Sequence, residues 1–183
     1  MGNLFTRELP IDILVKGWLD KLDSSLFDQI FIFFSFLGSL LAFIILALLG
    51  MIFFIKYKKY LEGIFVYMSL LISWVSMYYL KLLFNRERPP GEKIISTFGA
   101  SFPSGHAMIA TVFYGFITYL VLDNLKIKRR KLTMGILGGL IFFIGISRVY
   151  FNVHYTTDII AGYFFGGVLL FIIIAAYKLI RNK

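Results

Sequence analysis

The feature that most constrains the fold is a set of long stretches without a charged residue. Residues 29–55 contain none in 27 positions, residues 63–80 none in 18, and residues 159–177 none in 19. Because a helix rises about 1.5 Å per residue, each stretch is long enough, or nearly so, to cross a hydrocarbon layer of about 30 Å. A soluble helical bundle would need a polar face on these helices, and they have none. We therefore predict membrane-spanning helices.

Two further stretches bring the number of predicted spans to five. Residues 104–122 and 132–147 are apolar apart from His106. The predicted fold class is an all-α, polytopic transmembrane helix bundle that forms one domain, residues 1–183. Within it, residues 28–183 form the transmembrane core, and the first span is expected to run without interruption over residues 28–55.

The N-terminal part, residues 1–27, has a different pattern. Apolar residues recur there at helical spacing after Pro10, with charged residues between them. They are Ile11, Leu14, Val15, Trp18, Leu19, Leu22 and Leu26. This pattern is typical of an amphipathic helix that lies in the membrane interface. The alternative is that residues 11–26 form a degenerate extra span.

The net charge of +9 is concentrated in clusters between the apolar stretches. The clusters are Lys56, Lys58 and Lys59; Lys126, Lys128, Arg129, Arg130 and Lys131; and Lys178, Arg181 and Lys183. By the positive-inside rule, all three clusters are predicted to be cytoplasmic, and the N-terminal helix then lies outside. This distribution argues against a nucleic-acid partner. The chain has no cysteine, which excludes disulfides and thiol chemistry.

Three blocks carry the remaining ionisable residues of interest, and all three fall at predicted outer ends of spans. They are residues 81–89 with Lys81, Arg86 and Arg88, residues 103–106 with His106, and residues 147–158 with Arg148, His154 and Asp158. Taken singly, each residue has a simpler explanation. A lysine or arginine at a helix end extends its charge to the headgroups, and a lone histidine can be an interior hydrogen-bonded residue.

The combination of blocks favours an anion site. Three cations, Lys81, Arg88 and Arg148, would repel one another in one pocket unless an anion were bound there. A phosphate fits, since the guanidinium fork matches its oxygens. Ser104 and the amide of Gly105 open a helix whose free N–H groups favour an anion. We therefore predict a phosphate-binding site made of these five residues.

The two histidines of the chain would supply the chemistry. Asp158 lies four residues after His154 and is expected to fix its tautomer, which leaves the other ring nitrogen as a nucleophile. His106 would protonate the departing oxygen and then activate water. No metal or other cofactor is expected, because the chain offers no carboxylate cluster and the cations neutralise the phosphate charge.

Together these blocks resemble the signature of the type 2 phosphatidic acid phosphatase superfamily. That signature reads Lys-x6-Arg-Pro, Pro-Ser-Gly-His and Ser-Arg-x5-His-x3-Asp, and it occurs here in order from Lys81 to Asp158. The resemblance implies a metal-independent lipid phosphatase with a phosphohistidine at His154, oriented by Asp158, with His106 as acid and base. It also implies phosphate binding by Lys81, Arg88 and Arg148, helped by Ser104 and Gly105. Many family members have six spans, one more than the five predicted here.

The expected function is removal of the terminal phosphate from a lipid at the outer face of a bacterial cytoplasmic membrane. Phosphatidylglycerophosphate, undecaprenyl diphosphate, phosphatidate and a lipid A-type glycolipid all present the same group, so the substrate stays open, as does the oligomeric state. Phe84, Phe98 and Phe102 are candidates for a lateral lipid path. Arg86 and Lys93 are expected to be solvated loop charges, with contact to a lipid headgroup as the alternative. The alternatives are phosphotransfer to another lipid, a non-catalytic lipid-binding protein, and an anion transporter.

Overall fold

The computed structural model of the chain describes residues 8–22, 24–91, 95, 97–124 and 130–182, and these residues form an all-helical membrane protein. Its helices are α1 (Pro10–Leu19), α2 (Ser25–Leu37), α3 (Leu40–Lys56), α4 (Tyr60–Phe84), α5 (Gly105–Asn124), α6 (Arg130–Tyr150) and α7 (Thr156–Arg181). The helices α4 to α7 are each long and apolar enough to cross a membrane, and the bent pair α2–α3 brings the number of candidate spans to five. The predicted fold class is confirmed.

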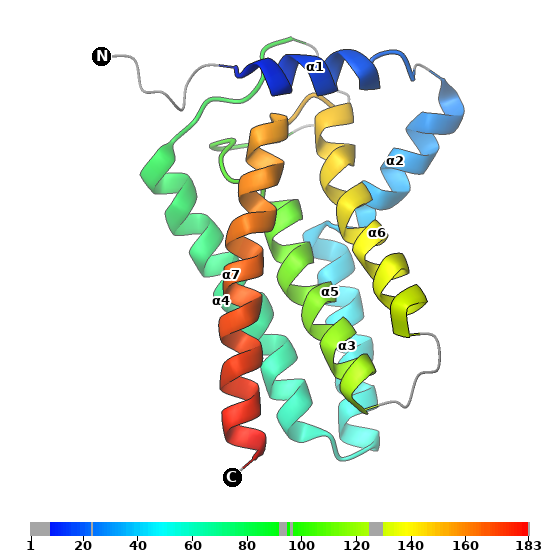
Figure 1. The fold of residues 1–183 in the computed structure, drawn as a ribbon, viewed down its shortest axis with the longest axis vertical. Helices are drawn as coiled ribbons and strands as arrows, with labels where there is room; N and C mark the ends of the chain where they lie inside the picture. Colours follow the sequence, from blue (N-terminus) through cyan, green and yellow to red (C-terminus); the bar gives the residue numbers. More distant parts are fainter. Residues whose placement is uncertain (1–7, 23, 92–94, 96, 125–129, 183) are drawn as a thin grey trace.

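The helix α5 runs through the middle of the bundle, with α4, α6 and α7 packed around it (Figure 1). Its side chains supply most of the large buried cluster, including Val112, Phe113 and Phe116. The end of α4, the start of α5, the end of α6 and the start of α7 all lie at the same end of the bundle, beneath α1 (Figure 1). This arrangement brings the three sequence blocks together.

The first predicted span is broken, which corrects the expectation of one continuous helix. The helix α2 ends before Gly38, and Ser39 starts α3 by accepting a hydrogen bond from the amide of Ala42 at 3.2 Å. The two helices are bent by 54° relative to each other. A Cβ atom on Gly38 would lie 2.4 Å from Ile144 and 2.9 Å from the ring of His106. Gly38 therefore allows the break to pack directly against a predicted catalytic side chain.

The N-terminal helix α1 lies across the end of the bundle (Figure 1). It has 10 residues, or about 15 Å of helix, which is too short for the alternative of an extra span. Ile13, Leu14 and Trp18 are exposed on it, as expected for a helix in the membrane interface. However, the helix ends at Leu19, well before residue 27, and Asp12 is buried although the sequence placed it on the polar face.

Two pairs of glycines spaced four residues apart, Gly135 with Gly139 and Gly162 with Gly166, differ in their contacts: only the second pair lies close to another helix. On α7, a Cβ atom on Gly162 would lie 2.9 Å from the carbonyl oxygen of Ser104, and one on Gly166 would lie 2.8 Å from that of Met108. The pair of glycines at positions 135 and 139 on α6 faces open space. The second pair thus lets α7 approach the start of α5, where the predicted site lies.

The described residues of the predicted basic clusters gather at the opposite end of the bundle. Lys56 ends α3, Arg130 begins α6, and Lys178 and Arg181 lie in the last turn of α7. Arg181 also forms an ion pair with Asp123 at the end of α5. Residues 126–129 and 183 of the predicted clusters lie outside the described residues. The three sequence blocks and the basic helix ends are therefore separated by the length of the spans, as the sequence predicted.

Candidate active site

One cavity of about 270 Å³ is lined by most of the predicted site residues, which come from all three sequence blocks. These lining residues are Lys81, Arg88, Gly105, His106, Arg148 and His154. The remaining walls are largely apolar and include Phe43, Trp74 and Phe98. Both histidines and all three predicted cations therefore face the same space.

The turn between α6 and α7 positions His154. Asn152 takes a left-handed conformation with φ of 54°, which asparagine tolerates better than most residues and which ends α6. The amides of Val153 and His154 then donate to the carbonyl oxygen of Arg148 at 3.1 and 3.3 Å. The His154 side chain is only 4% exposed. The turn thus fixes the imidazole at the base of the cavity.

Asp158 holds the ring of His154 from behind. Its carboxylate oxygen Oδ2 lies 3.3 Å from His154 Nδ1 and accepts a hydrogen bond from the amide of Tyr155 at 3.0 Å. The hydroxyl of Ser101 donates to the same oxygen and lies 3.3 Å from His154 Nδ1. Because a carboxylate only accepts hydrogen bonds, this arrangement favours the tautomer with the proton on Nδ1. The lone pair on Nε2 is then directed to the cavity side, where a terminal nitrogen of Arg88 lies 3.5 Å away.

The three cavity cations hydrogen-bond neutral groups of the protein. Lys81 Nζ donates to the carbonyl oxygens of Ala100 and Ser101, and Arg148 donates to the hydroxyl of Ser35. Arg88 donates through Nε and both terminal nitrogens to the carbonyl oxygens of Gly99, Phe98 and Val153. In the described part of the chain, none of these cations forms an ion pair with a carboxylate. The cavity is therefore strongly positive and suited to an anion.

His106 reaches the same cavity as His154, from the first turn of α5. Its ring packs against the backbone of Gly38, at the break between α2 and α3. One terminal nitrogen of Arg88 lies 3.5 Å from Nε2 of His154. Both imidazoles therefore line the same cavity as the three cations, and their opposed roles as acid and nucleophile stay a prediction.

Ser104 and Gly105 have different surroundings at the start of α5. Gly105 lines the cavity, as predicted. Ser104 is fully buried: its hydroxyl accepts a weak hydrogen bond of 3.5 Å from the amide of Ala107, and its amide donates to the carbonyl oxygen of Asp158 at 3.0 Å. In this structure Ser104 caps α5 and joins it to α7. Its contact with phosphate stays a prediction.

Arg86 corrects the expectation of a solvated loop charge. It is 4% exposed and donates to Asp158 Oδ1 at 2.8 Å, on the side of the carboxylate away from His154. Sequence reasoning also missed Ser101 and the buried Asp12, which contacts Arg86 at 3.5 Å. Lys93, given the same expectation, lies outside the described residues. The sequence offered one indication that Arg86 belongs to the site, namely its position two residues before Arg88. It did not show that Asp158 and Asp12, its partners in the structure, would lie close to it.

Burial and charge set the protonation of the groups between the spans. Burial lowers the pKa of His154 to about 3, with Lys81 and Arg88 acting in the same direction and Asp158 opposing them. Burial also lowers the pKa of Arg88, although Asp158 again opposes the shift. His154 is therefore neutral at physiological pH, which a nitrogen nucleophile requires.

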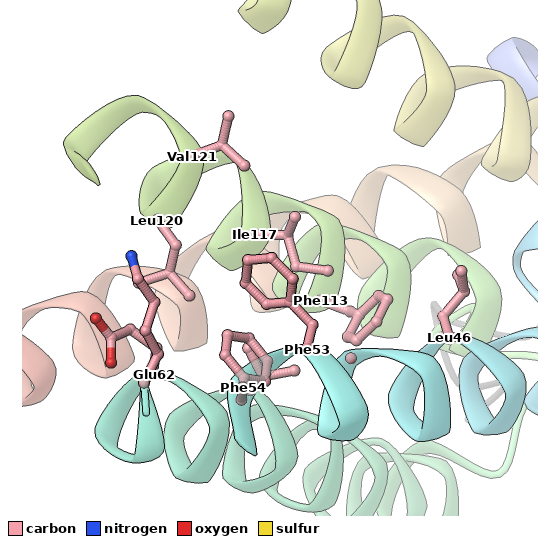
Figure 2. A pocket seen from close by; sticks show the side chains of 11 residues that line it. Leu46, Phe53, Phe54, Glu62, Phe113, Ile117, Leu120 and Val121 are labelled. Carbon is pink, nitrogen blue, oxygen red and sulfur yellow. The ribbon is translucent and has the colours of Figure 1, made fainter. Parts of the chain in front are cut away.

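Two apolar cavities lie outside the catalytic one. The first, of about 410 Å³, adjoins the catalytic cavity and shares Leu40, Phe43 and Trp74 with it. The second, of about 230 Å³, lies between α3, α4 and α5 near their basic ends (Figure 2). Its labelled side chains are aromatic or aliphatic apart from Glu62, and it contains no histidine (Figure 2). It therefore lacks the groups that the predicted chemistry requires.

The phenylalanines proposed for a lateral lipid path are divided by the structure. Phe98 is 91% exposed and lines the catalytic cavity. Phe102 is buried and packs edge-on against Phe84, with ring centroids 4.7 Å apart. Phe98 is thus at the mouth of the cavity, whereas the other two support the loop beneath it.

Fold and site together define a polytopic helical membrane protein with two histidines and three cations around one cavity. The chain belongs to the PAP2 superfamily, whose family model matches residues 61–181. Phosphatidylglycerophosphatase B of Bacillus subtilis (strain 168) is 32% identical over 136 residues, which span 73% of this chain and 66% of that protein.

Two solved structures share the fold. The first is a transmembrane PAP2-type phosphatidylglycerolphosphate phosphatase from Bacillus subtilis, with a TM-score of 0.85 and 25% identity over 92% of this chain and 85% of that one. The second is LpxE of Aquifex aeolicus, with a TM-score of 0.73 and 22% identity over 91% of this chain and 96% of that one. The similarity to LpxE concerns the fold alone.

Proposed function

We propose that the protein is a lipid phosphatase that hydrolyses the terminal phosphate of a membrane lipid through a phosphohistidine at His154. The observation that carries this proposal is the shared cavity, in which a neutral, oriented His154 faces three cations without carboxylate partners and a second histidine. The membership of the PAP2 superfamily supports the same chemistry.

In the first step, Nε2 of His154 attacks phosphorus and the bond from phosphorus to the lipid oxygen breaks. His106 gives its proton to that oxygen, so the lipid leaves as a neutral alcohol or, from a diphosphate, as a monophosphate. Asp158 accepts the hydrogen bond from Nδ1 and stabilises the positive charge that develops on the ring. Lys81, Arg88 and Arg148 neutralise the oxygens of the transferred group.

In the second step, water replaces the histidine. His106, now neutral, takes a proton from water while the water oxygen attacks phosphorus and the bond between phosphorus and His154 breaks. Inorganic phosphate leaves, and His154 is again neutral while His106 is protonated. The reaction is proposed to need no metal. Among the described residues, no three His, Asp or Glu side chains form a group that could hold one.

The adjoining apolar cavity supports a lipid as the substrate. Its lining is almost entirely aliphatic and aromatic, with Leu71 and Trp74 partly exposed on α4. An acyl chain placed there would leave its headgroup phosphate in the cationic cavity, because the two cavities share residues. Phosphatidylglycerophosphate is our first candidate, since the two relatives from Bacillus subtilis are described as phosphatases of that lipid.

The test is phosphate release by the purified protein from a panel of lipids, with His154→Gln as the matched control. The panel holds phosphatidylglycerophosphate, undecaprenyl diphosphate, phosphatidate and a lipid A-type glycolipid. We expect release that orthovanadate inhibits and EDTA does not, and none from the control. Strong EDTA sensitivity would contradict the metal-free scheme. A phosphorylated acceptor lipid in place of free phosphate would show a phosphotransferase, and no turnover of any lipid would overturn the proposal.

We also propose that the site faces the outside of a bacterial cytoplasmic membrane, because the basic helix ends lie at the other end of the bundle. Since the chain has no cysteine, Glu87→Cys gives a single reporter on the exposed loop beside the site. An impermeant maleimide should label it in intact cells. Labelling only after permeabilisation would invert the topology.

A further inference from the structure

The side chain of Arg86 connects the predicted catalytic carboxylate to the N-terminal helix. One terminal nitrogen, NH1, donates to Asp158 Oδ1 and to the hydroxyl of Thr157, both at 2.8 Å. The other, NH2, lies 3.5 Å from Asp12 Oδ2. The guanidinium also lies over the ring of Tyr155, 4.0 Å from its centroid. Arg86 therefore contacts α1 and the start of α7 at the same time.

The two oxygens of Asp158 have separate partners. Oδ1 is held by Arg86, while Oδ2 receives the amide of Tyr155, the hydroxyl of Ser101 and the ring of His154. With the first oxygen fixed, the carboxylate cannot rotate about its last bond without losing a charged hydrogen bond. Arg86 thus keeps Oδ2 directed at Nδ1 of His154.

Asp12 completes the network from the side of α1. Its Oδ1 accepts from the amide of Thr157 at 2.8 Å, which caps the first turn of α7, and its Oδ2 accepts from the Thr157 hydroxyl at 3.1 Å. Oδ2 also accepts from the amide of Leu9 at 3.0 Å, which fixes the start of α1. With Asp12 3% and Asp158 0% exposed, two buried carboxylates lie on either side of one buried guanidinium.

We propose that Arg86 is a positioning residue for the reaction, that Asp12 holds it in place, and that α1 is thereby part of the active site. This inference rests on the proposed function, because it assigns Arg86 a task in nucleophilic attack by His154. Arg86 does not line the catalytic cavity, so it acts through Asp158 and not on the phosphate. Loss of Arg86 should therefore lower kcat and leave KM little changed.

The test compares Arg86→Gln, Arg86→Lys and Asp12→Asn in purified protein, with Asp20→Asn as the control, since Asp20 is an exposed carboxylate just after the end of α1. We expect kcat to fall about 100-fold in Arg86→Gln, because a small misplacement of the nucleophile costs that much. Arg86→Lys should recover part of the loss, since lysine supplies the charge but not the fork. Asp12→Asn should cost about tenfold, and Asp20→Asn nothing.

Two readouts separate a positioning role from a structural one. The affinity for inorganic phosphate as a competitive inhibitor, which tests the cationic cavity, should be unchanged in Arg86→Gln, and melting in detergent shows whether that variant is folded. If Arg86→Gln does not fold, Asp12→Asn and Arg86→Lys carry the test. Wild-type kcat in the folded variants, or equal losses in kcat and in the affinity for inorganic phosphate, would overturn the inference while leaving the proposed function intact. An inactive wild-type protein would instead overturn the proposed function.

Discussion

The exchange Asp158→Asn tests the site most sharply, because it removes one charge and keeps the shape. Four donors converge on the carboxylate: an Arg86 nitrogen on Oδ1, and the Tyr155 amide, the Ser101 hydroxyl and the His154 ring on Oδ2. An asparagine has one accepting oxygen, and its NH2 group donates. Whichever way the amide turns, one side of this network becomes a donor facing a donor.

The two orientations of the asparagine have different consequences. In both orientations Arg86 loses its ion pair with residue 158, because asparagine is neutral, and only the more distant Asp12 remains as a charged partner, which costs up to about 3–5 kcal/mol of stability. If the NH2 group faces Arg86, the hydrogen bond between the two side chains is lost as well. If the NH2 group faces His154, Nδ1 must accept a hydrogen bond, the proton moves to Nε2, and no lone pair remains for attack. In serine proteases the same type of change lowers kcat about 10⁴-fold by fixing the wrong tautomer. We expect a loss of about 10³–10⁴-fold here.

The assay is phosphate release from phosphatidylglycerophosphate in detergent micelles, run at a temperature where melting curves show both proteins to be folded. Ser101→Ala provides a matched comparison, because it removes one donor to Asp158 without changing the charge. It should cost far less than Asp158→Asn. A folded Asp158→Asn protein with kcat within tenfold of wild type would refute the assignment of Asp158 as the group that orients the nucleophile.

Three further predictions concern the acid, the buried imidazole and the helix contact. In His106→Ala, formation of the phosphoenzyme should slow much more with a substrate that releases a lipid alcohol than with one that releases a good leaving group such as p-nitrophenol. Equal slowing with both substrates would show that His106 is not the acid. His154 has its pKa lowered to about 3 in the folded protein, whereas an unfolded histidine has a pKa of about 6.5. Between these two pH values the unfolded state therefore binds one more proton than the folded state. As pH falls from 6.5 to 5, the free energy of unfolding of wild type should decrease by about 2 kcal/mol more than that of His154→Gln. An equal dependence of this free energy on pH in both proteins would contradict the burial of His154. Gly166→Val should destabilise the protein by about 1–3 kcal/mol, because the new side chain would clash with Met108. Gly167 faces open space, so Gly167→Val should not destabilise it. Equal melting temperatures of the two variants would refute the close contact of α5 with α7.

The spans and the site blocks could be predicted from the sequence, because their signals are local. Absence of charge over 18 or more residues is sufficient to indicate a span. The spacing of His154 and Asp158 puts both at one helix start. Their convergence with Lys81 and His106 followed from topology, since the ends of successive spans alternate between the two faces of a membrane.

The interruption of the first span at Gly38 and Ser39 could not be predicted, because glycine and serine are both common within membrane helices. The reason for the break is tertiary: the ring of His106 and the side chain of Ile144 occupy the space where a side chain would lie. The helix α1 was also predicted only in part. Its apolar face was visible in the sequence, but the burial of Asp12 depends on Arg86 and Thr157, which are far away in the chain.

The central claim is that the nitrogen of one histidine takes the phosphoryl group from the lipid. The most direct measurement is a rapid acid-free quench of the protein with a lipid labelled with ³²P in its terminal phosphate, followed by peptide mapping. We predict a label that is stable in alkali, lost in acid and located on His154, and that is absent from His154→Gln. A label on any other residue, or turnover without a labelled protein, would contradict this account.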